Sequence, residues 1–158
     1  MCGICGIYNE KAPKTIEAML ESIRHRGPDS FMTMLFGNHS LGECGLNIVS
    51  SKEDTLPLID EENEIALLFN GEIYNYQEIK DDLVKEGYVF NSDTDSEVII
   101  PLYRKCGKDF VKHLKGMFAI VIIDKEQIIL ARDRFGIKPL FYYQIDEKLI
   151  FGSEIKSL

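Results

Sequence analysis

The segment from Met117 to Asp124 is apolar at every position except its last. A short run of this kind is suited to a β-strand that is covered on both faces. The chain must therefore build layers on either side of this strand, and this requirement constrains the fold more than any other stretch of the sequence.

The remaining pattern predicts further strands and several helices. Apolar and β-branched stretches predict strands at Ile4–Tyr8, Met32–Phe36, Leu41–Val49, Ile65–Phe69, Ile128–Arg132, Leu140–Tyr143 and Leu149–Gly152. Apolar residues at helical spacing predict helices at Thr15–Arg24, Asn75–Glu86 and Ser96–Lys105, and a short one at Lys108–Leu114. Pro101 either kinks the third helix or shortens it. Because strands and helices do not alternate regularly, we expect an α+β fold rather than a doubly wound parallel sheet.

Length and charge limit the possible functions. A chain of 158 residues with 45% hydrophobic content is long enough for one domain with a single core. Its net charge of −8 argues against nucleic acid as a partner. No apolar stretch approaches the roughly 20 residues of a membrane span, and the N-terminus lacks the features of a secretory signal. We therefore expect a soluble, cytoplasmic protein.

The first two residues, Met1 and Cys2, predict a nucleophile at the chain terminus. Removal of Met1 would leave Cys2 with a free α-amine, whose reference pKa is about 7.7–8.0. A useful fraction of that amine is neutral at physiological pH and can take the thiol proton. The alternative is that the chain begins with Met and Cys by chance.

Cys2 and Cys5 form a C-x-x-C pattern, which suggests a second class of function. A zinc site would need another pair of ligands, and neither Cys44 nor Cys106 lies in a second C-x-x-C or near suitably spaced histidines. A redox pair would need a preceding strand that places it at a helix start. No metal is expected, and the four cysteines are predicted to be free thiols.

Two further segments are candidates for substrate contacts. Asn70 and Gly71 follow an apolar strand, and an amide beside a glycine N–H can donate two hydrogen bonds to an oxyanion. By itself, however, Asn-Gly is an ordinary turn dipeptide. The stretch 92–97 contains three carboxylates, which either cap a helix or hold an ammonium group.

Four motifs together resemble the glutaminase domain of class II glutamine amidotransferases, specifically the asparagine synthetase branch. They are Met1-Cys2-Gly3-Ile4, Arg24-His25-Arg26-Gly27-Pro28-Asp29, Asn70-Gly71-Glu72-Ile73-Tyr74-Asn75, and Arg132-Asp133 followed by Gly136-Ile137-Lys138-Pro139-Leu140-Phe141. By itself, the Arg24–Asp29 motif is typical of a charged helix end, and the motif that begins at Arg132 is typical of a charged turn. The resemblance spans essentially all 158 residues in the same order.

This resemblance implies an N-terminal-nucleophile hydrolase fold, a four-layer sandwich of two antiparallel β-sheets between helical layers. It implies that Cys2 attacks the side-chain amide of L-glutamine, releases ammonia and leaves a glutamyl thioester for water to cleave. Asn70 and the Gly71 N–H would form the oxyanion hole. The residues implied in substrate binding are Glu72, Asp95, which would face the α-amino group, and the strand segment Leu46, Asn47, Ile48 and Val49.

One departure from the family pattern concerns Gly45. Members of this branch usually carry an arginine there, which grips the α-carboxylate of glutamine. Its loss predicts binding weaker by roughly ten- to a hundredfold. Glu43 would add repulsion if it points inward, whereas Arg24, Arg26 or Lys52 are candidate substitutes.

Three functions follow as hypotheses. The first is a glutaminase module that supplies ammonia to a synthetase domain for ATP-dependent asparagine synthesis from aspartate, as the N-terminal part of a longer protein or as a stand-alone relative. The second is a weakly active or inactive regulatory or binding module of the same fold, favoured by Gly45. The third is a small metal or redox protein that uses Cys2 and Cys5. No cofactor is expected in this domain, because ATP and Mg²⁺ would belong to the synthetase domain.

Overall fold

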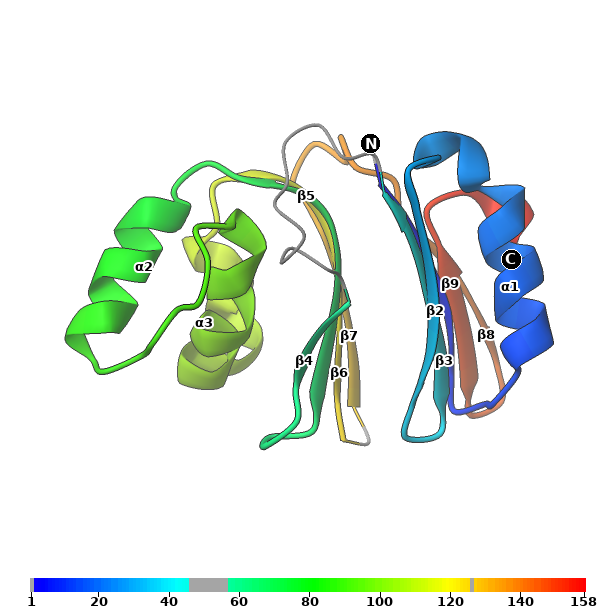
Figure 1. The fold of residues 1–158 in the computed structure, drawn as a ribbon, viewed down its shortest axis with the longest axis horizontal. Coiled ribbons are helices and arrows are strands. Elements are labelled where there is room, and N and C mark those ends of the chain that lie inside the picture. The colour runs from blue at the N-terminus through cyan, green and yellow to red at the C-terminus, as the bar shows by residue number, and fades with distance from the viewer. Residues whose placement is uncertain (1, 46–56, 126) are drawn as a thin grey trace. The chain divides into compact units, whose positions relative to one another are not determined.

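The structure, a computed structural model, describes residues 2–45, 57–125 and 127–158. The chain divides into two compact units. Unit 1 comprises residues 1–50 and 138–158, and unit 2 comprises residues 51–137. Each unit contains one antiparallel sheet with helices on one of its faces, as Figure 1 shows. The prediction of an α+β fold with two antiparallel sheets is thereby confirmed, whereas the prediction of one domain stays a prediction.

Unit 1 is built on a five-stranded sheet whose strands run in the order β2-β3-β1-β9-β8. Every neighbouring pair is antiparallel. The N-terminal strand is therefore central, flanked by one strand from early in the chain and one from its end. The strands are β1 (Gly3–Tyr8), β2 (Ser30–Phe36), β3 (His39–Gly45), β8 (Phe141–Ile145) and β9 (Lys148–Gly152).

Helix α1 (Pro13–Ser22) covers one face of this sheet. Its buried residues Ile16, Met19 and Leu20 recur at helical spacing and pack with Cys5, Ile7, Ile23 and Cys44. The helix begins at Pro13, two residues before the predicted start at Thr15, and the fixed φ of proline suits the first turn. The Ala12 N–H that precedes it donates to Ser40 Oγ at 2.8 Å.

Unit 2 contains a four-stranded antiparallel sheet with the order β4-β5-β6-β7. The strands are β4 (Leu58–Asp60), β5 (Ile65–Ile73), β6 (Gly116–Asp124) and β7 (Gln127–Arg132), and β4 was not predicted. Helices α2 (Tyr76–Lys85) and α3 (Ile99–Cys106) lie on one face (Figure 1). Alternate residues of β6 pack in the hydrophobic core with these helices, namely Phe118, Ile120 and Ile122. The residues between them are buried on the other face of the sheet, namely Ala119, Val121 and Ile123. The strand covered on both faces is thus confirmed.

Short 3-10 segments complete both units. Unit 1 contains η1 (Arg24–Arg26) and η4 (Ile155–Ser157), and unit 2 contains η2 (Asp95–Val98) and η3 (Gly107–His113). Pro101 lies in the first turn of α3, so it shortens the predicted helix rather than kinking it. Strand β5 continues to Ile73, four residues beyond the predicted end at Phe69. Asn70 and Gly71 therefore lie inside a strand rather than in a turn.

Candidate active site

Cys2 is held by its backbone immediately before the central strand of unit 1. Arg26 Nε donates to the Cys2 carbonyl at 3.2 Å. The Ile4 N–H donates to Ser153 Oγ at 3.0 Å, and the Ser153 N–H donates to the Ile4 carbonyl at 2.8 Å. The chain around the half-buried Cys2 is therefore tied both to the 24–26 loop and to the segment after β9.

The direction of the Cys2 side chain follows when the alternation of β1 (Gly3–Tyr8) is extended by the one residue that precedes the strand. Gly3 and Cys5 lie on the face that α1 covers, because a Cβ at Gly3 would approach Ile23 Cδ1 at 3.1 Å and Cys5 packs in the α1 core. Cys2 and Ile4 consequently point to the opposite face. Because Cys2 and Cys5 point to opposite faces, the C-x-x-C geometry argues against a shared metal or a disulfide between them.

The Arg24–Asp29 loop is fixed against the end of β3. A Cβ at Gly27 would lie 2.5 Å from the Cys44 carbonyl carbon and from the Gly45 nitrogen, so only glycine permits this approach. The Asp29 N–H donates to the Gly45 carbonyl at 3.0 Å. The first contact explains Gly27, and together the contacts fix the segment that places Arg26 beside the backbone of Cys2.

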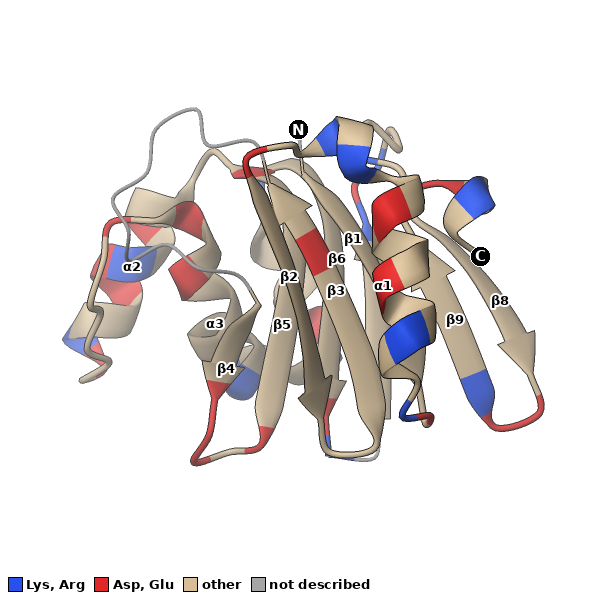
Figure 2. Cartoon of the chain, turned by 45° about the vertical axis from the view of Figure 1, so that its right-hand side comes forward, with Lys and Arg blue, Asp and Glu red and all other residues tan. Residues whose placement is uncertain are grey.

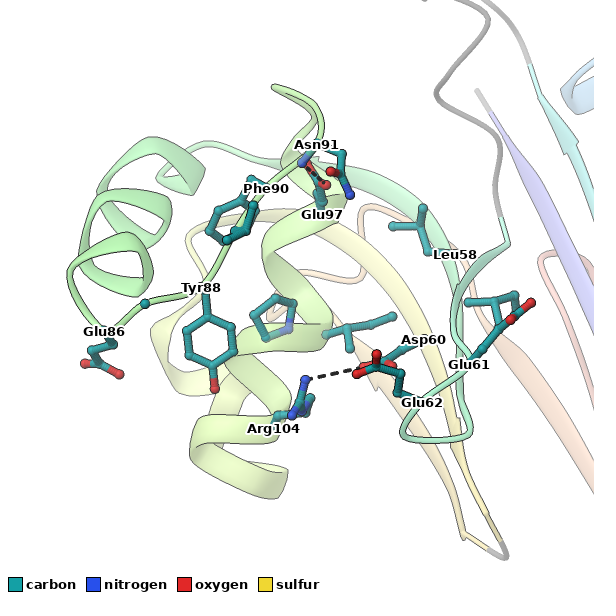
Figure 3. A pocket seen from close by; sticks show the side chains of 15 residues that line it. Leu58, Asp60, Glu61, Glu62, Glu86, Tyr88, Phe90, Asn91, Glu97 and Arg104 are labelled. Atoms are coloured by element: carbon teal, nitrogen blue, oxygen red, sulfur yellow. Dashed lines mark hydrogen bonds and ion pairs between the residues drawn. The ribbon is translucent and has the colours of Figure 1, made fainter.

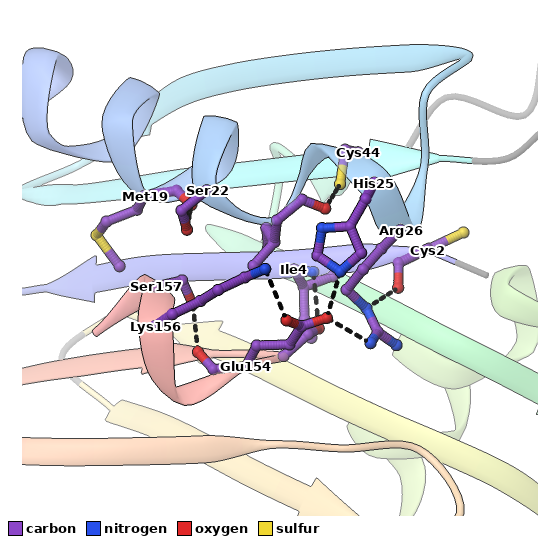
Figure 4. Close-up of polar contacts among 12 residues, drawn as sticks. Cys2, Ile4, Met19, Ser22, His25, Arg26, Cys44, Glu154, Lys156 and Ser157 are labelled. Carbon is purple, nitrogen blue, oxygen red and sulfur yellow. Dashed lines mark hydrogen bonds and ion pairs between the residues drawn. The ribbon is translucent and has the colours of Figure 1, made fainter.

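Glu154 contacts two cationic side chains and the His25 ring near Cys2 (Figure 4). Its carboxylate contacts Arg26 Nη1 at 3.0 Å, His25 Nε2 at 2.8 Å and Lys156 Nζ at 3.3 Å. Desolvation alone would raise the pKa of Glu154, but hydrogen bonds from Arg26, His25 and Lys156 outweigh it and hold the pKa at about 2. Figure 4 shows the Cys2 side chain directed away from this cluster, so the cluster positions the backbone rather than the thiol.

The candidate replacements for a carboxylate-binding arginine are already engaged where the structure describes them. Arg24 is half-exposed, pairs with Glu21 at 2.8 Å and lies over the Phe31 ring. Arg26 is bound to Glu154 and to the Cys2 carbonyl, although its Nη2 is buried without a hydrogen-bond partner among the described residues. Lys52 lies outside the described residues, as do Leu46, Asn47, Ile48 and Val49.

Unit 2 presents the side chain of Asn70 on the face of its sheet away from the helices. Phe69 and Ile73 face the helical core, so the alternating positions Asn70 and Glu72 face the other way. Asn70 is 1% exposed, and its Nδ2 is buried without a hydrogen-bond partner among the described residues. A buried amide donor of this kind is available for a ligand, at the cost of its own desolvation.

The ladder between β5 and β6 leaves the Gly71 N–H outside its pairing. Gly71 is opposite Phe118 in the ladder. The Phe118 N–H instead donates to the Asp133 carboxylate, and the Phe118 carbonyl accepts from the Asp133 N–H. The Gly71 N–H therefore points away from β6, as the Ile73 N–H does. Among the residues that the structure describes, strand β4 pairs with residues 65–67 and not with Gly71. A Cβ at Gly71 would lie 2.3 Å from the Met117 oxygen, which explains the glycine.

Asp95 and Glu72 form an acidic pair at the end of β5. Asp95 Oδ2 accepts a hydrogen bond from the Ile73 N–H at 2.6 Å, which joins η2 to the strand. Desolvation raises the pKa of Asp95, and the nearby charge of Glu72 raises it further. A cationic group of a ligand would stabilise both carboxylates, so this pair is suited to an ammonium.

A separate cavity of about 1010 Å³ lies in unit 2, beside α3, and its side chains are drawn in Figure 3. It contains several carboxylates, but Asp60 pairs with Arg104 at 3.5 Å, and Glu97 accepts hydrogen bonds from Asn91 and Ser92. Neither Asn70 nor Asp95 lines it. It is therefore distinct from the predicted site residues.

Comparisons with known proteins bear on the family. The model of a family described as glutamine amidotransferase domain matches residues 1–158. The chain belongs to this family. It is 40% identical to glutamine-hydrolyzing asparagine synthetase 2 of Bacillus subtilis (strain 168). That alignment covers 100% of this chain and 22% of that protein. It is also 40% identical to amidase chry2 of Gibberella zeae, in an alignment that covers 99% of this chain and 26% of that protein.

The fold of this amidotransferase domain also matches a solved structure. Glutamine phosphoribosylpyrophosphate amidotransferase of B. subtilis, complexed with ADP and GMP, superposes with a TM-score of 0.82 at 23% identity. The match covers 99% of this chain and 42% of that one, and it concerns the fold alone. The chain spans about a quarter of the length of the curated relatives named above. No helix in the described ranges is long and apolar enough to cross a membrane.

Sequence reasoning missed Glu154 among the residues around Cys2. Nothing in the segment 153–158 distinguishes that acid from a surface carboxylate, and only the sheet order brings it to Arg26. The Arg24-His25-Arg26 run was a detectable signal, because an arginine that is buried in the fold needs a counter-charge, as Arg26 does.

Proposed function

We propose that this amidotransferase domain hydrolyses L-glutamine to glutamate and ammonia, with Cys2 as the nucleophile. The observation that carries the proposal is the Nδ2 of Asn70, which is buried and has no hydrogen-bond partner among the described residues. Leaving such a donor unsatisfied costs about 1–3 kcal/mol. An oxyanion that exists only during the reaction would satisfy it, which is the arrangement that stabilises a transition state more than a ground state.

The proposed reaction begins after Met1 is removed. The α-amine of Cys2 takes the thiol proton, and Sγ attacks the side-chain amide carbon of glutamine. The oxyanion accepts hydrogen bonds from Asn70 Nδ2 and the Gly71 N–H. The amine then returns the proton to the leaving nitrogen, and ammonia departs as the C–N bond breaks. A γ-glutamyl thioester remains, which water cleaves to glutamate and the free thiol.

Substrate orientation is assigned to the acidic pair. Asp95 is fixed by the Ile73 N–H, so its carboxylate is held in position before a ligand arrives. We propose that Asp95, with Glu72 beside it, binds the α-ammonium of glutamine. The segment Leu46–Val49 is proposed to contact the substrate through its backbone.

The ammonia is proposed to serve ATP-dependent synthesis of asparagine from aspartate in a synthetase domain. The support is the name and length of the curated relatives, of which this chain matches only about a quarter. ATP and Mg²⁺ would be bound by that domain, so no cofactor is proposed here. A weakly active or regulatory module of the same fold is the alternative, and Gly45 favours it.

The test is glutamine-dependent release of glutamate and ammonia by the purified chain, with intact-mass confirmation that Met1 is absent. Cys2→Ala is the control, because it removes the nucleophile and keeps the fold. Turnover that disappears in Cys2→Ala, together with a mass adduct on Cys2 from an electrophilic glutamine analogue, would support the proposal. A correctly trimmed chain that neither turns over glutamine nor takes the adduct would contradict it and favour the regulatory module.

A further inference from the structure

Glu43 is unusual among the charged residues of the described strands. The others, such as Asp60, Asp124 and Lys148, lie at a strand end or next to one, whereas Glu43 lies inside β3. Figure 2 shows that charge is otherwise concentrated in the helices and loops. A carboxyl group within a buried strand needs a compensating interaction.

The register of β3 gives the direction of the Glu43 side chain. Gly42 faces α1, because a Cβ there would approach Ile16 Cγ1 at 3.2 Å, and Cys44 Sγ donates to the Ile23 carbonyl. Glu43 therefore points to the opposite face, and it pairs directly with Ile4 across the β1–β3 ladder. Cys2 points to that same face from two residues before Ile4. Glu43 in β3 and Cys2, which immediately precedes the neighbouring strand β1, are thus directed to the same face of one sheet.

The carboxyl group of Glu43 is enclosed. The residue is 5% exposed, and its Oε2 is buried without a hydrogen-bond partner among the described residues. Burying an ionised carboxylate with an unpaired oxygen is costly, so this enclosure favours the neutral acid. The pKa of Glu43 is raised well above its usual range by desolvation, in the same direction. A neutral carboxylic acid has an O–H to donate, and its hydrogen bond to a carboxylate is short and strong.

We propose that Glu43 binds the α-carboxylate of the glutamine substrate by donating a hydrogen bond from its protonated carboxyl group. This inference rests on the proposed function, in which glutamine lies beside Cys2. It also replaces the expectation that an inward Glu43 repels the substrate, since a neutral acid attracts a carboxylate where a charged one would repel it. Gly45 is then compatible with glutamine binding, because the acid two residues earlier on the same face supplies a donor.

The test compares two substrates on three proteins. L-glutamine carries the α-carboxylate, and L-glutamine α-amide replaces it with a neutral carboxamide. Glu43→Leu removes the donor at similar volume, whereas Glu43→Gln keeps an N–H donor. We expect Glu43→Leu to raise the KM for L-glutamine by about ten- to a hundredfold and the KM for the α-amide by less than about twofold. Glu43→Gln should keep the KM for L-glutamine within about fivefold of the wild-type value.

The substrate comparison separates this role from a structural one, which would weaken both substrates alike. Thermal unfolding checks that each variant folds, and Glu43→Met replaces Glu43→Leu if the latter unfolds early. Equal changes for both substrates, or no change for either, would overturn the inference while leaving the glutaminase intact. Wild-type protein that turns over neither substrate would overturn the proposed function, and the inference with it.

Discussion

Arg26 and Glu154 form an ion pair at 3.0 Å between side chains that are 128 residues apart in sequence. The pair joins the loop that contacts Cys2 to the segment that follows β9. Arg26 is 9% exposed and Glu154 24%, so the pair is partly shielded from solvent. Because Arg26 also donates to the Cys2 carbonyl, the ion pair links the position of the nucleophile to the end of the described fold.

Replacing this acid should therefore destabilise the protein. Glu154→Gln leaves Arg26 without its counter-charge, and we expect the free energy of unfolding to fall by about 1.5–3 kcal/mol. Denaturant unfolding at pH 7 measures it. The matched control is Glu21→Gln, which removes the exposed ion pair with Arg24 and should cost less than about 1 kcal/mol. Equal losses in the two variants would contradict a special role for Glu154.

The same carboxylate predicts how stability depends on pH. The pKa of Glu154 is lowered from 4.5 to about 2 in the folded protein. A depressed pKa stabilises the fold above the unfolded value, and this contribution is lost as pH falls from about 4.5 toward about 2. Wild-type protein should lose stability through that window more steeply than Glu154→Gln does. Thermal unfolding from pH 6 to pH 2 compares the two, and parallel curves would refute the assignment.

Asn70 should contribute to the rate rather than to substrate affinity. Asn70→Ala removes the proposed oxyanion donor, and we expect kcat to fall about a hundred- to a thousandfold with little change in KM. The control is Asn75→Ala in the same motif, because Asn75 bonds the His113 carbonyl and the Lys115 N–H and takes no part in the proposed chemistry. Steady-state kinetics on both variants provide the measurement. A change in KM alone would place Asn70 in binding instead.

Two glycines should respond differently to the addition of one methyl group. At Gly71 a Cβ would meet the Met117 oxygen at 2.3 Å and the Phe118 Cα at 2.7 Å, which are backbone atoms that cannot rotate away. At Gly45 it would meet Ser30 Oγ at 2.4 Å, and that side chain is free to change rotamer. We expect Gly71→Ala to lower the free energy of unfolding by about 1–3 kcal/mol and Gly45→Ala by less than about 1 kcal/mol. Denaturant unfolding of both variants measures the difference.

Much of the fold could be predicted because its elements are patterned locally. The apolar run in β6 and the helical spacing of Ile16, Met19 and Leu20 depend only on neighbouring residues. The end of β5 could not be predicted in this way. Asn70 and Gly71 have turn propensity, but their pairing with β6, fixed by long-range contacts, keeps them in the strand.

The candidate site likewise contains residues that local sequence indicates and residues that only long-range contacts bring together. Cys2, Asn70 and Gly71 were predicted from distinctive motifs and Asp95 from the family resemblance, and their roles stay predictions. The burial of Glu43 and the direction of its pKa shift were not predictable, since neither depends on the residues next to it in sequence. Glu154 was missed for a related reason, because the order β1-β9 brings the chain end to Arg26.

Asp95 should determine how kcat/KM for glutamine falls on the acidic side of its pH profile. Its pKa is raised by desolvation and by the charge of Glu72, whereas binding an ammonium requires the carboxylate form. As pH falls through this raised pKa, Asp95 is protonated and kcat/KM for glutamine should fall. Asp95→Asn should raise KM by about ten- to a hundredfold at neutral pH and abolish this acidic limb of the profile. Asp93→Asn is the control, because Asp93 is exposed and pairs with Lys80. An acidic limb that persists unchanged in Asp95→Asn would assign the titration to another group and remove Asp95 from substrate binding.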